Sequence, residues 1–166
     1  MTSNRIKILS SLIKNYYIGC ELGVAEGKFS EEILLYSNIK YLYSIDMWAG
    51  DRGHDNIEYM KAQNRLSPYK EKNTILKYKF DKAIKLFDDN YFDFIYIDGY
   101  AHTGQDNGKT LNDWWPKLKS GGIFAGHDYD QAWPKTIDRV NEFISINNLL
   151  LHIIYDKPFN SWYTIK

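Results

Sequence analysis

Apolar residues along the chain occur in two alternating kinds of segment. In one kind, apolar side chains recur every three or four residues, a spacing typical of helices with one buried face. In the other, mostly apolar residues follow one another, as in strands buried on both faces. This pattern predicts helices at 3–14, 29–36, 56–66, up to 86, up to about 118 and at 136–146, and strands at 16–22, 41–47, 74–80, 92–97, 123–125, 149–155 and 161–165.

The order of these segments indicates the fold class. After the first helix, strands and helices alternate repeatedly, and two terminal strands flank a turn at 157–160. Such alternation predicts an α/β fold, a Rossmann-like three-layer sandwich with a mostly parallel sheet and an antiparallel C-terminal hairpin. Ligands of such sheets bind beyond the carboxyl ends of the strands. The residues that follow each strand are therefore the candidates for a functional site.

The composition narrows the class of protein further. The 166 residues carry 21 basic and 21 acidic side chains, and this balance argues against a nucleic-acid partner. Cys20 is the one cysteine, so an internal disulfide is excluded, and no apolar run has the length that a membrane span needs. We therefore expect a single cytoplasmic domain over 1–166 that binds neither nucleic acid nor membrane.

Two motifs in the first half suit a small polar ligand. The first strand ends in Glu21-x-Gly23-x-x-x-Gly27, whose glycines allow a tight turn before a helix. Backbone N–H groups of such a turn can meet a polar or anionic ligand, and a plain strand–helix turn is the alternative. Asp46 follows the second strand at about the 20-residue offset from which an acid reaches the ribose of a nucleoside. For Asp46, the alternative is a solvent-facing loop position.

Acids and histidines follow two of the later strands. Asp98 and His102 come after the strand at 92–97, and His127 and Asp128 after the strand at 123–125. Such a group can take a proton from a hydroxyl, because histidine titrates near neutral pH. It can also hold a divalent cation through its carboxylates. The alternative is that these side chains serve only the structure.

The motifs of the second half are similar to those of one known family. They are Tyr96-Ile97-Asp98-Gly99…His102, Asp113-Trp114-Trp115, Leu118-Lys119-Ser120-Gly121-Gly122 and Gly126-His127-Asp128-Tyr129. From about 17 to 143 the chain resembles a class I S-adenosylmethionine-dependent methyltransferase, in the small group of methyltransferase domain 24. The resemblance implies a sheet order of 3-2-1-4-5-7-6 and methyl transfer to oxygen, often on sugars or glycosylated small molecules.

The same resemblance implies two bound groups, S-adenosylmethionine and, as in related O-methyltransferases, a magnesium or other divalent ion. The turn from Gly23 to Gly27 would hold the amino-acid end of the cofactor, and Asp46 its ribose. The predicted cofactor-binding residues are Glu21, Gly23, Val24, Ala25, Gly27, Ser30, Asp46, Met47, Trp48, Phe80, Asp81 and Asp98. The predicted metal ligands are Asp98, His127 and Asp128, and the predicted catalytic residues are Asp98, His102, His127 and Asp128.

Two residues depart from the family pattern. His127 stands where the metal set has its second acid, and magnesium prefers oxygen ligands, so another metal or a weaker site is expected. Tyr100 stands where some relatives have a carboxylate base, which leaves His102 or His127 as the base.

Two other functions stay open at this point. Tyr36 and Lys40 form the Tyr-x-x-x-Lys pattern of nicotinamide-dependent oxidoreductases, although the pattern falls on a helix away from the strand ends. A non-catalytic binding module is the second alternative, because only the N-terminal helix (1–15) and a polar segment (49–72), a candidate lid or substrate loop, lie outside the minimal fold. A homodimer partner or a fused neighbouring domain would complete the pocket for a small-molecule or glycan acceptor.

Overall fold

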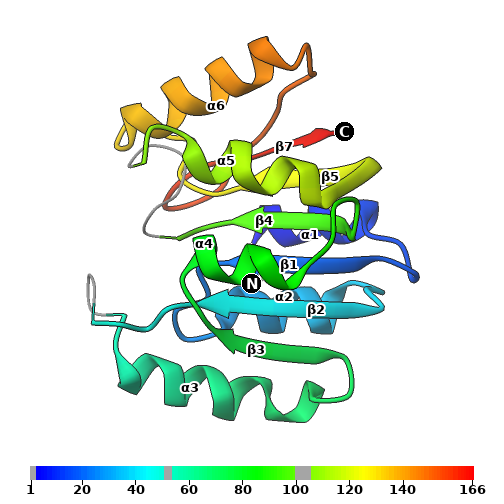
Figure 1. Ribbon diagram of the computed structural model, residues 1–166, viewed down its shortest axis with the longest axis vertical. Coiled ribbons are helices and arrows are strands. Elements are labelled where there is room, and N and C mark those ends of the chain that lie inside the picture. The colour runs from blue at the N-terminus through cyan, green and yellow to red at the C-terminus, as the bar shows by residue number, and fades with distance from the viewer. Residues whose placement is uncertain (1–2, 51–53, 100–105) are drawn as a thin grey trace.

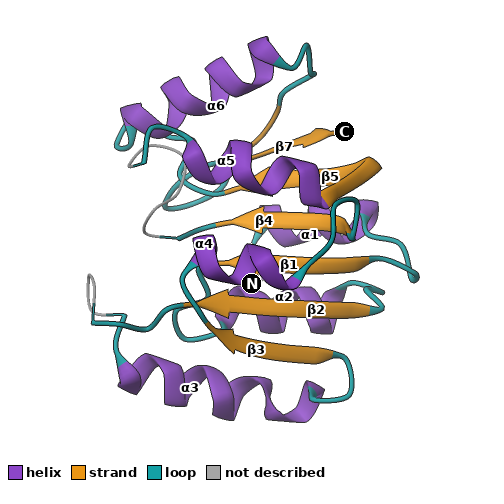
Figure 2. Ribbon diagram, viewed as in Figure 1, coloured by secondary structure: helices purple, strands orange, loops and turns teal. Residues whose placement is uncertain are grey.

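A seven-stranded sheet runs through the middle of the protein, in the order β3-β2-β1-β4-β5-β7-β6 (Figures 1 and 2). The computed structural model describes residues 3–50, 54–99 and 106–166. The strands are β1 (Ile18–Leu22), β2 (Tyr41–Asp46), β3 (Asn73–Lys77), β4 (Phe92–Ile97), β5 (Leu118–Gly126), β6 (His152–Ile154) and β7 (Ser161–Ile165). The predicted fold class and strand order are confirmed.

Helices cover both faces of this sheet. They are α1 (Asn4–Leu12), α2 (Lys28–Tyr36), α3 (Asn56–Leu66), α4 (Phe80–Ala83), α5 (Lys109–Trp114) and α6 (Pro134–Ile146), with short 3₁₀ turns at Ser67–Tyr69, Ile84–Leu86 and Trp115–Lys117. None of the helices in the described ranges has the length and apolarity that a membrane crossing requires.

Two apolar cores hold the three layers together. One core packs α1, α2 and the end of α3 against one face of the sheet, with Phe94 and Tyr96 of β4 in its centre. The other core packs α4, α5 and α6 against the opposite face, with Phe92, Ile95 and Ile97 of the same strand. Because both faces of β4 are buried, its sequence is a continuous apolar run apart from Asp93.

The strand pairing creates a crevice at one edge of the sheet. β1 pairs in parallel with β2 on one side and with β4 on the other, and β4 pairs in parallel with β5. The chain leaves β1 toward β2 and returns to the other side of β1 at β4, which makes the β1–β4 boundary the switch point of the sheet. The carboxyl ends of these strands therefore flank one site.

Several predicted strand boundaries are wrong, and β6 and β1 are shorter than the predicted strands at 149–155 and 16–22. β3 ends at Lys77, and Phe80 already begins α4, so the predicted strand at 74–80 is too long. β5 begins at Leu118, and the glycine pair at 121–122, expected to end a helix, lies inside the strand. A backbone irregularity opposite Phe92 and Phe94 accommodates this pair, and Gly121 takes a φ of 77° there. The two glycines also hydrogen-bond with the backbone of Lys166, which extends the contact with β7.

Candidate functional site

A cavity of about 660 Å³ opens at the carboxyl ends of the central strands. Small-molecule sites in proteins have volumes of roughly 300–1,000 Å³, so this cavity has the size of a ligand site. Its walls come from the turn after β1, the ends of β2 and β4, and the first turns of α4 and α5. The predicted site residues in these walls are Glu21, Gly23, Val24, Ala25, Asp46, Met47, Phe80, Asp81, Asp98 and Asp128.

The turn between β1 and α2 passes directly against the end of β4. Gly23 has a φ of 94°, and a Cβ added there would lie 1.9 Å from the carbonyl oxygen of Asp98. Gly27 has a φ of 79° at the position before α2. Left-handed backbone of this kind favours glycine, and the space at Gly23 excludes every other residue. Gly23 therefore lets the turn pass close to the backbone of Asp98, and Gly27 allows the left-handed conformation that precedes α2.

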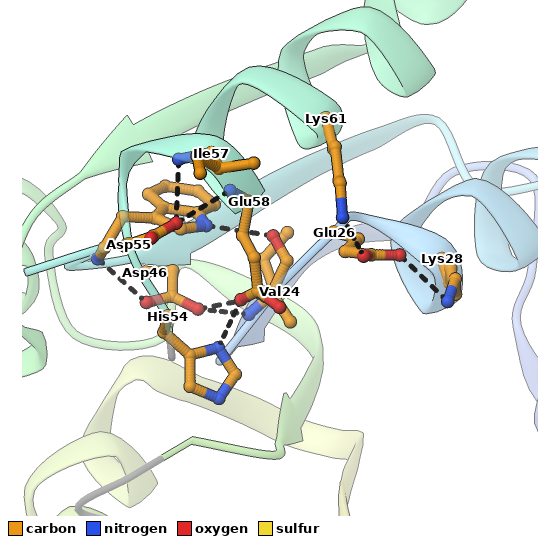
Figure 3. A network of polar contacts seen from close by, with 11 residues as sticks. Val24, Glu26, Lys28, Asp46, His54, Asp55, Ile57, Glu58 and Lys61 are labelled. Carbon is orange, nitrogen blue, oxygen red and sulfur yellow. Dashed lines mark hydrogen bonds and ion pairs between the residues drawn. The ribbon is translucent and has the colours of Figure 1, made fainter. Parts of the chain in front are cut away.

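The carboxylate of Asp46 organises this turn from the end of β2 (Figure 3). Its Oδ2 accepts hydrogen bonds from the backbone N–H groups of Val24 and Ala25, at 2.8 and 3.0 Å. Its Oδ1 accepts one from the N–H of Trp48 at 3.1 Å. A carboxylate has about four acceptor positions, so within the described chain one position on Oδ1 is left for a ligand. The N–H groups of Val24 and Ala25, expected to face a ligand, are thus bonded to the chain's own acid.

Trp48 supports the turn from behind the cavity. Its side chain is buried, its ring lies 4.8 Å from that of Tyr59, and its Nε1–H donates to the carbonyl oxygen of Ala25 at 2.9 Å. The residues that line the cavity do not include Trp48, which is one of the predicted cofactor-binding residues. Ser30, Gly27 and His127 also lie outside the cavity lining, although His127 contacts Asp128, which belongs to it.

Glu21 is a buried acid at the floor of the cavity. Its Oε2 accepts a hydrogen bond from the hydroxyl of Ser30, which also contacts the hydroxyl of Ser44 at 2.7 Å. The chain of polar groups ends at Asn73, whose Nδ2 donates to Ser44 at 2.9 Å. Burial raises the pKa of Glu21 to about 8, even though the bond from Ser30 acts in the opposite direction. Glu21 is therefore mainly protonated at neutral pH.

Asp98, His127 and Asp128 meet where β4 and β5 end. His127 Nδ1 lies 2.9 Å from Asp128 Oδ1 and 3.7 Å from Asp98 Oδ1. One candidate ligand atom of each residue lies within 4.8 Å of the others, as a shared metal ion would require. Asp128 has a φ of 60°, an uncommon conformation for a residue with a side chain, and such strain gathers at functional sites. The structure thus brings three of the predicted residues together, and the fourth, His102, lies outside the described residues.

Arg5 is a cavity residue that the sequence patterns do not indicate. α1 carries its guanidinium across the site, 4.1 Å from the ring centroid of Phe29. Arg5 Nη1 lies 3.3 Å from the hydroxyl of Tyr96 and 3.6 Å from Asp98 Oδ2. Helical periodicity predicts α1, but it cannot tell where a helix that precedes the first strand will dock. No signal in the sequence separates Arg5 from a surface arginine.

The described part of the predicted lid contributes two more cavity residues. α3 begins after Asp55, whose side chain accepts hydrogen bonds from the N–H groups of Ile57 and Glu58. His54 Nδ1 lies 2.9 Å from Glu58 Oε2, and both residues line the cavity (Figure 3). Trp133, at the start of α6, lines it too. Tyr100 and His102 lie outside the described residues.

Comparisons with known proteins identify both a family and a fold. Residues 20–129, about two thirds of the chain, match the family model described as "Methyltransferase domain". No curated protein matches the chain. Several solved structures share the fold. A protein of Staphylococcus aureus assigned as a caffeoyl-CoA O-methyltransferase is 15% identical with a TM-score of 0.75, over 100% of this chain and 85% of that one.

Two further structures have the same architecture. A protein of Streptococcus mutans assigned as a methyltransferase, solved in complex with SAH (S-adenosylhomocysteine), is 13% identical over 98% of this chain and 96% of its own, with a TM-score of 0.71. The precorrin-6y C5,15-methyltransferase of Geobacter metallireducens is 10% identical over 98% and 87%, with a TM-score of 0.75. At these identities, the structures establish the shared fold.

Proposed function

The chain belongs to the methyltransferase domain family, and we propose that it transfers the methyl group of S-adenosylmethionine to a hydroxyl oxygen of a small molecule, such as a sugar or glycan. The observation that carries the oxygen assignment is the cluster of His127, Asp98 and Asp128 beside the cavity. An oxygen acceptor with a high pKa must lose a proton, and this cluster contains a group that can take it.

The residues that line the cavity fit S-adenosylmethionine. That ligand joins an adenosine to a charged amino acid, so it needs apolar contacts, ribose acceptors and groups of both charges. The cavity offers Met47 and Phe80 as apolar groups, the remaining acceptor position of Asp46, and Arg5 and Asp98 as the opposite charges. Phe80 packs so closely over Gly99 that a Cβ at position 99 would lie 2.3 Å from its ring, and both residues line the cavity.

The chemistry requires mainly alignment. S-adenosylmethionine supplies a methyl group on a sulfonium, which is already a good leaving group. The protein lowers the barrier by holding the acceptor oxygen in line with that methyl group. Asp128 Oδ1 lies 2.9 Å from His127 Nδ1 and orients the imidazole ring, so that His127 Nε2 takes the proton of the acceptor hydroxyl.

A divalent metal fits the same three side chains. Asp98, His127 and Asp128 offer two carboxylates and one imidazole, a set that suits manganese, iron or zinc better than magnesium. A bound ion would supply a positive charge that lowers the pKa of the acceptor hydroxyl. In that case His127 would serve as a ligand through Nδ1 instead of as the base. Methyl transfer measured before and after treatment with EDTA separates the two roles, because only the metal role is lost.

The acceptor we propose is neutral rather than a nucleic acid. In the cavity lining, acids (Glu26, Asp46, Asp81, Asp98, Asp106, Asp113 and Asp128) outnumber basic residues (Arg5, Lys28, Lys79 and Lys109), and this excess of negative charge disfavours a phosphate backbone. Trp133 and Phe159, with ring centroids 6.0 Å apart, form an aromatic wall that suits the apolar face of a sugar ring. Phe159 also lies 6.3 Å from the ring of His127, so this wall adjoins the proposed base.

The test combines a binding assay and a transfer assay. Calorimetry should detect SAH binding, and NADH should not bind, which removes the oxidoreductase alternative. Radiolabelled S-adenosylmethionine is then offered with a panel of free sugars, uncharged glycosides and phenols, and with amines of similar size. Methylation of hydroxyl compounds that disappears in His127→Ala, while SAH still binds, supports the proposal. Methylation of the amines alone overturns it.

A further inference from the structure

α1 is positioned in the fold so that Arg5 reaches the cavity from one side of the sheet. Ile6 and Leu9 bury the helix against the core that contains α2, and α1 and α2 lie next to each other behind the sheet (Figure 1). The backbone N–H of Arg5 donates to Asp156 Oδ2 at 2.9 Å, and the side chain of Asn4 donates to the carbonyl oxygen of Tyr155 at 3.0 Å. These contacts hold the first turn of α1 in one place.

The guanidinium of Arg5 is held in one orientation, but only some of its N–H donors have partners within the described residues. It stacks on Phe29 at 4.1 Å, and Nη1 contacts the Tyr96 hydroxyl and Asp98 Oδ2. Within the described residues, the hydrogen bonds and ion pairs of the side chain all use Nη1. A guanidinium has five N–H donors in a rigid fork, so those on Nη2 and Nε remain for a ligand. An arginine prepared in this way suits a planar carboxylate.

The surroundings of Arg5 indicate which anion it would accept. Phe29 lies in the first turn of α2, where the unpaired N–H groups of a helix favour negative charge. Asp46 and Asp98 line the same part of the cavity and disfavour a ligand with net negative charge, such as a phosphate. A carboxylate next to an ammonium group satisfies both conditions, since the acids attract the ammonium while Arg5 binds the carboxylate.

We propose that Arg5 binds the carboxylate of the α-amino-acid end of S-adenosylmethionine and so discriminates the intact cofactor from adenosine compounds that lack this group. The inference rests on the proposed function, because it assumes that the cavity binds that cofactor. It assigns a binding role to the helix that precedes the minimal sheet, and the pair of Arg5 and Asp98 serves to orient the guanidinium.

The experiment compares three ligands on the full-length protein by calorimetry. SAH carries the carboxylate and the ammonium, its decarboxylated analogue keeps only the ammonium, and 5′-methylthioadenosine has neither. Arg5→Gln should weaken SAH binding at least tenfold and change the dissociation constants of the other two ligands by less than about twofold. Arg5→Lys should lose less than Arg5→Gln, because it keeps the charge without the fork. Lys7→Gln removes a charge from the exposed side of the same helix and should change none of the three.

Three results would overturn the inference, and one other result would bear on the function instead. An equal loss for all three ligands in Arg5→Gln would mean that Arg5 only supports the fold. Unchanged SAH binding would exclude the carboxylate contact. Unchanged SAH binding with a raised KM for an acidic acceptor would assign Arg5 to the acceptor. If the wild-type protein binds neither SAH nor methylthioadenosine, the proposed function itself fails.

Discussion

Replacing Glu21 with glutamine should make the protein more stable at neutral pH. Burial raises the pKa of Glu21 to about 8 in the native protein, whereas an unfolded chain has a pKa near 4.5. Between these two values the native state holds one more proton than the unfolded state, so the free energy of unfolding falls as the pH rises. Glutamine does not titrate, and its side-chain oxygen can still accept the hydrogen bond from Ser30.

The size of the effect follows from the pKa difference. One pKa unit corresponds to about 1.36 kcal/mol, so the stability gained by Glu21→Gln should grow by about 3 kcal/mol between pH 5 and pH 8. Above about pH 9 the gain should stay constant, since the acid is then mostly ionised in both states. Urea unfolding of the wild-type protein and the variant at each pH measures this difference and cancels the titration of all other groups.

Glu26 provides the matched control. Its pKa is lowered to about 2 by hydrogen bonds from Lys61 and Lys28 at the surface. Its contribution is present above pH 4.5 and is lost only as the pH falls below that value, so Glu26→Gln should show no pH-dependent difference between pH 5 and 8. If the gain of Glu21→Gln is also independent of pH in that range, Glu21 is ionised at neutral pH and the reasoning from burial is refuted.

Three further predictions concern the cavity. Asp46→Ala removes the proposed ribose acceptor and should weaken SAH binding at least tenfold in calorimetry. It also removes the hydrogen bonds to the turn and should lower the melting temperature. An unchanged dissociation constant would exclude the ribose contact, and an unchanged melting temperature would exclude the role in the turn. Gly23→Ala should cost more than about 3 kcal/mol in urea unfolding, since its Cβ would collide with the backbone of Asp98, and a loss below 1 kcal/mol would contradict the tight approach. Manganese should bind more tightly than magnesium in calorimetry, and His127→Ala should remove the preference; equal affinities in the wild-type protein would count against a ligand role for the imidazole.

Local sequence patterns predicted much of the fold because burial restricts which residues a strand can contain. The β4 segment, for example, is buried on both faces and is therefore a nearly continuous apolar run that is recognisable in the sequence. The order of strands and helices also predicted that Asp46, Asp98, His127 and Asp128 lie at one edge of the sheet, because the carboxyl ends of parallel strands meet there. The boundaries of β5 were missed because its glycine pair reads as a helix stop, whereas pairing with β4 and β7 overrides that local signal.

The remaining features of the site depend on contacts between distant residues. Nothing in a local pattern shows that Asp46 would bond to the turn 21 and 22 residues before it, or that Trp48 would pack beneath that turn. The raised pKa of Glu21 comes from complete burial, which is decided by the packing of α2 and not by its neighbours in sequence. Arg5 reaches the cavity only because α1 docks on α2 and on the last hairpin.

The bond between Arg5 and Asp156 also has a consequence for synthesis. The two residues are 151 positions apart, so α1 leaves the ribosome long before the hairpin that anchors its first turn. Until that hairpin emerges, the nascent chain lacks the contact that fixes Arg5 over the cavity. A ligand that depends on Arg5 would therefore engage only chains in which this hairpin has been synthesised and folded, and ligand binding would then favour these chains over those that still lack it.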